Sequence, residues 1–118
     1  GRIRRILRSR TGVMQAALEA EMPDGTTWTE PEGGYQVWVE LGFDVDTRDL
    51  LADAARGGVL FAPGSQFFTD QGPSRGLRLT LAQANEAEIE RGVGILGEVV
   101  RRRQELAAAG SDTRAVNM

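Results

Sequence analysis

Arg78 is the strongest candidate for a side chain that binds a ligand. It lies between Leu77 and Leu79 in the run 77–81, where leucines alternate with polar residues as in a strand with one buried face. The alternation directs the leucines to a core and the guanidinium to the opposite face. A guanidinium presents a planar fork of N–H donors that fits a carboxylate through two hydrogen bonds. The pattern alone favours a simpler interpretation, a solvated or salt-bridged strand arginine.

Two turn-like segments are the other candidates. Gly33 and Gly34 belong to a Pro-Glu-Gly-Gly turn, and glycine lets a backbone approach a ligand closely. An ordinary β-turn would account for the same residues. The segment 61–68 runs from an apolar stretch through Pro-Gly into a loop, where Phe67 or Phe68 would either line a pocket or anchor the loop.

The amino-acid composition excludes most other catalytic mechanisms. The chain has no histidine and no cysteine, so imidazole catalysis, disulfides and thiolate metal sites are excluded. All fourteen basic side chains are arginine, so no lysine can hold a cofactor as a Schiff base or activate a serine. Carboxylates are scattered without acid–base spacing, and no phosphate-binding glycine loop is present. Hydrolase, kinase and redox functions therefore have no support.

Charge and hydropathy limit the partners and the location. The net charge of −3 and pI near 5.0 argue against direct binding of nucleic acid. The arginines between residues 2 and 10 fit the solvated face of an amphipathic helix. We find no apolar run that would span a membrane and no signal peptide, so we expect a cytoplasmic protein. The start at Gly1 rather than Met indicates a fragment, a processed chain or a cloning scar.

Periodicity predicts which elements position these residues. We expect helices over 2–21, over 47–56 and from Asn85 onward, and strands over 26–29, 35–41, 59–62 and 77–81. Asp46 and Asn85 are predicted helix caps, with Glu88 completing a capping box. The order predicts a two-layer α/β sandwich, a small mixed or antiparallel sheet with helices on one face. We expect one domain over 1–106 and a disordered tail over 107–118.

Three segments, by their order and spacing, resemble the C-terminal small domain of fold-type I aminotransferases that use pyridoxal phosphate (PLP). They are Pro31–Leu41, Gly58–Gly64 and Leu77–Leu81. The likeness is to the branch of 2-aminoadipate and kynurenine aminotransferases and MocR-type regulators. The resemblance implies that Arg78 binds the substrate α-carboxylate, that Gly33 and Gly34 border the substrate pocket, and that Phe67 lies near its entrance.

The resemblance also implies what surrounds the chain. PLP would belong to the parent protein and none would attach covalently here, so the parent is expected to be an enzyme and the isolated chain is not. The sheet face that carries Trp38 and Arg78 would dock on the large PLP-binding domain, and the parent would form a homodimer. The ligand would be an amino-acid substrate or effector. Two alternatives remain: the effector domain of a MocR/GntR-type transcription regulator, and a standalone non-catalytic interaction module.

Overall fold

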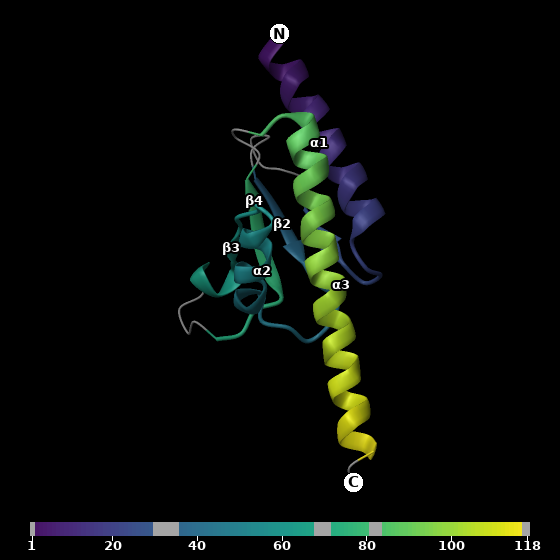
Figure 1. The fold of residues 1–118 in the computed structure, drawn as a ribbon. Coiled ribbons are helices and arrows are strands. Elements are labelled where there is room, and N and C mark those ends of the chain that lie inside the picture. Colours follow the sequence, from purple (N-terminus) through teal and green to yellow (C-terminus); the bar gives the residue numbers. More distant parts are fainter. Residues whose placement is uncertain (1, 30–35, 68–71, 81–83, 117–118) are drawn as a thin grey trace.

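Two long helices, α1 (Arg2–Glu21) and α3 (Glu86–Val116), lie side by side across one face of a four-stranded sheet (Figure 1). This computed structural model describes residues 2–29, 36–67, 72–80 and 84–116, with side chains between residues 12 and 109 of those ranges. The predicted first helix matches α1 in both bounds.

The sheet has the strand order β1 (Thr27–Trp28), β2 (Gln36–Glu40), β4 (Gly76–Thr80), β3 (Ala62–Pro63). Every neighbouring pair of strands is antiparallel. The predicted two-layer α/β sandwich is therefore confirmed. The two longer strands, β2 and β4, form the centre of the sheet.

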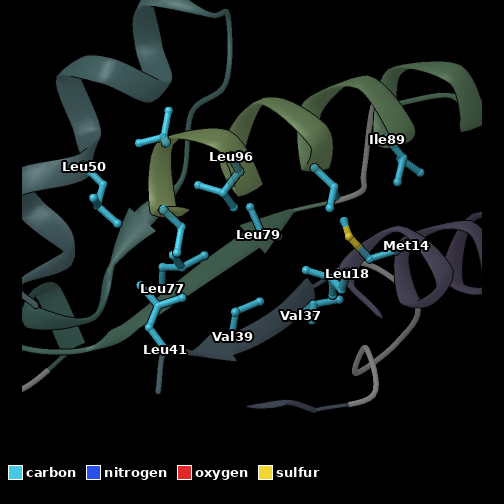
Figure 2. Packing of buried hydrophobic residues seen from close by; sticks show 13 residues of the cluster. Met14, Leu18, Val37, Val39, Leu41, Leu50, Leu77, Leu79, Ile89 and Leu96 are labelled. Atoms are coloured by element: carbon cyan, nitrogen blue, oxygen red, sulfur yellow. The ribbon is translucent and has the colours of Figure 1, made fainter. Parts of the chain in front are cut away.

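The core lies between the sheet and the helices (Figure 2). Val37 and Val39 of β2 and Leu77 and Leu79 of β4 are buried on the helix side. Four apolar residues at helical spacing on α3 are buried against the sheet and α1: Ile89, Val93, Leu96 and Val100. Burying side chains of this size stabilises a fold by about 1.5–3 kcal/mol each. Because strand residues alternate, the residues between these core positions lie on the other face of the sheet.

Shorter elements join the strands. Asp46 caps the 3₁₀ helix η1 (Thr47–Leu50), which continues as α2 (Leu51–Arg56). A second 3₁₀ helix, η2 (Gly64–Phe67), follows β3. At the start of α3 the predicted capping box is confirmed: the Glu88 N–H donates to Asn85 Oδ1 at 2.8 Å, and the Asn85 N–H donates to Glu88 Oε1 at 3.2 Å.

Two elements depart most from the sequence prediction. The strand predicted over 59–62 pairs only at Ala62 and Pro63, because the Val59 N–H bonds the Ala54 carbonyl at the end of α2 instead. The segment 107–118, predicted as a disordered tail, continues α3 to Val116. The alanines at 107–109 favour helix over the first turn of this extension. The domain bounds 1–106 remain a prediction.

The helices within the described ranges include none that is both long enough and apolar enough to cross a membrane.

Candidate functional site

Arg78 lies on the central strand β4, on the sheet face opposite α1 and α3. Its neighbours in the chain, Leu77 and Leu79, are buried among the helices (Figure 2). Its cross-strand partners are Trp38 on β2 and Ala62 on β3. The alternation predicted from the sequence therefore holds, and it directs the guanidinium away from the core.

An aromatic side chain from a distant segment meets this guanidinium. Arg78 Cζ lies 4.6 Å from the ring centroid of Phe67, the last residue of η2. That separation is within the range of cation–π attraction. The ring occupies one side of the cation, so the N–H donors of the guanidinium that point away from the ring remain able to bind an anion.

Trp38 completes a cluster of three side chains. Its ring centroid lies 5.9 Å from that of Phe67 at an interplanar angle of 75°, the edge-to-face arrangement that aromatic pairs favour. The Trp38 Nε1–H donates to Glu40 Oε2 at 3.2 Å. The indole also lies against Gly76, where an added methyl group would overlap its ring. Trp38 is therefore held from three sides.

Arg78 lacks the ion pair that most arginine side chains make in the described part of the chain. Within the described residues, the ion pairs use other arginines, including Arg48, Arg75 and Arg103, and none uses Arg78. Arg78 is half-buried, and its Nε is buried without a hydrogen-bond partner in the same part of the chain. A buried N–H without a partner costs about 1–3 kcal/mol. A cation in this condition is well suited to bind a carboxylate.

A hollow of about 740 Å³ lies elsewhere, between the 44–49 segment and the C-terminal half of α3. Its charged side chains already pair with one another: Asp44 with Arg75, and Asp49 with Arg103. This hollow is therefore a weaker candidate for a ligand-binding site than the cluster around Arg78. The described residues also contain no cluster of acidic side chains that could hold a metal ion.

The structure brings together two of the four predicted site residues, Arg78 and Phe67. The other two, Gly33 and Gly34, lie outside the described residues, as does Phe68. Sequence reasoning did not find the contact of Trp38 with Phe67. The available signal was that Trp38 lies on the polar face of β2, beside Gln36 and Glu40, where a large apolar side chain needs a partner.

Comparison with known proteins identifies the domain. No protein-family model matches the chain. It is 38% identical over 92 residues to aromatic-amino-acid aminotransferase 1 of Thermococcus litoralis, which covers 78% of this chain and 22% of that protein. The crystal structure of LysN, an α-aminoadipate aminotransferase from Thermus thermophilus complexed with N-(5'-phosphopyridoxyl)-L-leucine, superposes with a TM-score of 0.80 at 34% identity. That match covers 89% of this chain and 27% of LysN.

The chain is homologous to the C-terminal small domain of fold-type I aminotransferases. A more distant relative is the uncharacterized HTH-type transcriptional regulator YdfD of Bacillus subtilis, 27% identical over 100 residues, which cover 85% of this chain and 20% of that protein. The chain spans about a quarter of the length of these relatives, so it corresponds to one domain of a larger protein.

Proposed function

We propose that this chain is the C-terminal domain of a PLP-dependent aminotransferase and that Arg78 binds the α-carboxylate of its substrate. The observation that carries the proposal is the state of Arg78: half-buried, stacked on Phe67, and without a carboxylate partner among the described residues. The Gly33–Gly34 turn and Phe67 would shape the pocket around the same substrate.

The binding step follows from guanidinium chemistry. A carboxylate is ionised at neutral pH and accepts two parallel N–H bonds from the fork, which fixes its plane as well as its position. An amino acid and the corresponding 2-oxo acid share this carboxylate, so one arginine serves both directions of amino transfer. Fixed orientation lowers the entropy that the reacting groups must lose in the transition state.

The cofactor would be held by the rest of the parent. PLP enzymes bind it through a lysine, and this chain has none, so its residues do not supply the covalent anchor. PLP provides the electron sink for amino transfer when bound. We infer that the lysine and the phosphate-binding groups lie in a large domain that covers the Trp38 and Arg78 face of the sheet, in a cytoplasmic homodimer.

The test uses the full-length parent protein. We expect Arg78→Ala to raise the KM for the amino acid about ten- to a hundredfold, the range expected for a lost hydrogen-bonded charge contact, with the absorbance of bound PLP unchanged. Arg78→Lys should recover little, because an ammonium lacks the planar fork. The matched control is Arg56→Ala, since Arg56 is exposed and its ion pair within the described residues is with Asp53, one turn earlier in the same helix. Wild-type kinetics in Arg78→Ala would reject the carboxylate role.

A second candidate is the effector-binding domain of a MocR-type transcription regulator. The similarity to a helix-turn-helix regulator favours it. Arg78 would then hold the carboxylate of an amino-acid effector. The sequence that precedes this domain in the parent distinguishes the two: a helix-turn-helix ahead of the PLP domain supports the regulator, and a parent without one supports the enzyme.

A further inference from the structure

Thr47 is a fully buried polar residue that the proposed function does not use. Its Oγ1–H donates to the Gly76 carbonyl at 2.7 Å, and the same oxygen accepts a longer bond, 3.4 Å, from the Gly64 N–H. Its own backbone N–H donates to the Ser74 carbonyl at 2.9 Å. This one residue therefore joins the start of η1 to the start of η2 and to the segment 74–76.

The two groups bonded by the hydroxyl lie beside the proposed site. Gly76 precedes Arg78 by two residues on β4, and Gly64 begins η2, which ends at Phe67. Hence the hydroxyl links the backbone that carries the guanidinium to the backbone that carries the stacked ring. The separation of these two backbones sets the 4.6 Å distance from Arg78 Cζ to the Phe67 ring.

The atoms around the Thr47 hydroxyl are closely packed, so neighbouring groups have little room to move if the hydroxyl is lost. A methyl group at Gly64 would overlap the Ser74 hydroxyl and come within 2.8 Å of the Gly76 carbonyl oxygen. The Ser74 hydroxyl accepts the Gly76 N–H at 3.1 Å. The sheet itself holds η2 weakly, because β3 pairs with β4 at only two positions, Ala62 and Pro63. Among the described residues, the Thr47 hydroxyl is bonded both to the first residue of η2 and to the first residue of β4.

We infer that Thr47 is a positioning residue for carboxylate binding: its hydroxyl fixes η2 against β4 so that Phe67 holds the Arg78 guanidinium in its binding orientation. The inference rests on the proposed function, since it concerns how Arg78 is presented to the substrate. Hydrogen-bonded support of this kind keeps a binding group within the narrow limits that orientation requires.

The experiment compares Thr47→Val and Thr47→Ser in the full-length parent. Valine keeps the shape and loses the hydroxyl, whereas serine keeps the hydroxyl and loses the methyl group. We expect Thr47→Val to raise the KM for the amino acid about fivefold, with bound PLP unchanged, and Thr47→Ser to stay near wild type. In a crystal structure of Thr47→Val, the Phe67 ring should lie farther than 4.6 Å from Arg78 Cζ.

Two controls separate positioning from stability. Val100→Ala removes volume from the core beneath α3, far along the chain from the site, and should lower the melting temperature without changing KM. A Thr47→Val, Phe67→Leu double variant should show less than the product of the two single effects on KM, because both changes act on the same guanidinium.

The outcomes are distinct. An unchanged KM in Thr47→Val, with KM raised in Arg78→Ala, overturns the role of Thr47 and leaves the proposed function intact. A Thr47→Ser variant as impaired as Thr47→Val, or fully multiplicative effects with Phe67→Leu, also overturns it. An unchanged KM in Arg78→Ala rejects the proposed function and this inference with it.

Discussion

At the scale of single residues, the site depends on contacts that join three elements. Arg78 comes from β4, Phe67 from η2 and Trp38 from β2, and the two aromatic rings meet edge to face beside the guanidinium. The rings limit the rotation of a long, flexible side chain before a ligand arrives. A carboxylate that binds such an arginine loses less side-chain entropy than one that must order it.

Phe67 offers a direct test of this preorganisation. An exposed cation–π contact contributes about 0.5–1 kcal/mol, so we expect Phe67→Leu to raise the KM for substrate about two- to fivefold in the parent. Phe67→Tyr keeps the ring and should behave like wild type. Steady-state kinetics checks both variants. Equal KM values for Phe67→Leu and Phe67→Tyr would show that stacking contributes nothing.

At the scale of elements, the contact of α1 with α3 depends on close backbone approach. Glu21 is the last residue of α1, and a methyl group at Gly97 would come within 2.7 Å of its carbonyl oxygen. A methyl group at Gly94 would meet nothing within 4 Å. Arg101 also bonds the Glu21 carbonyl from the next turn of α3. Although both glycines lie in the same helix, only at Gly97 would a side chain collide with α1.

Substitution of these two glycines should have opposite effects. We expect Gly94→Ala to stabilise the protein by about 0.5–1 kcal/mol, because alanine is the better helix former. Gly97→Ala should destabilise it by about 1–3 kcal/mol through overpacking against α1. Urea denaturation measures both. Equal stabilisation by the two alanines would mean that the backbone of α3 at Gly97 lies farther from Glu21 than this contact implies.

The cap of η1 predicts a dependence on pH. The Arg48 guanidinium bonds the Asp46 carboxylate at 2.6 Å and lowers the pKa of that carboxyl below its usual value. A carboxylate with a lowered pKa in the folded state adds stability above its ordinary pKa near 4, and this stability is lost as the pH falls through the lower folded value.

Asp46→Asn isolates this charge, because asparagine is also a good cap. We expect the variant to have a lower urea midpoint than wild type at pH 7, and the two midpoints to converge as the pH falls below 4. A difference that persists unchanged in acid would assign the effect of Asp46 to its shape rather than to its charge.

At the scale of the whole molecule, local patterns predicted most of the architecture. The helix periodicity of 2–21, the alternation around Arg78 and the Asn85 cap are properties of neighbouring residues, and all three appear in the structure. The bonds of Thr47 could not be predicted, since they join residues 17 and 29 positions apart. The contact of Phe67 with Arg78 depends on the same kind of long-range packing.

The central claim is that this domain presents Arg78 to the carboxylate of an amino acid. The most direct measurement is a crystal structure of the full-length parent with a bound amino acid or 2-oxo acid. The account predicts both carboxylate oxygens within about 2.7–2.9 Å of N–H groups of Arg78, in the plane of the guanidinium, with Phe67 still stacked on its face. A carboxylate held by other residues, with Arg78 turned away or paired to a side chain of the parent, would contradict it.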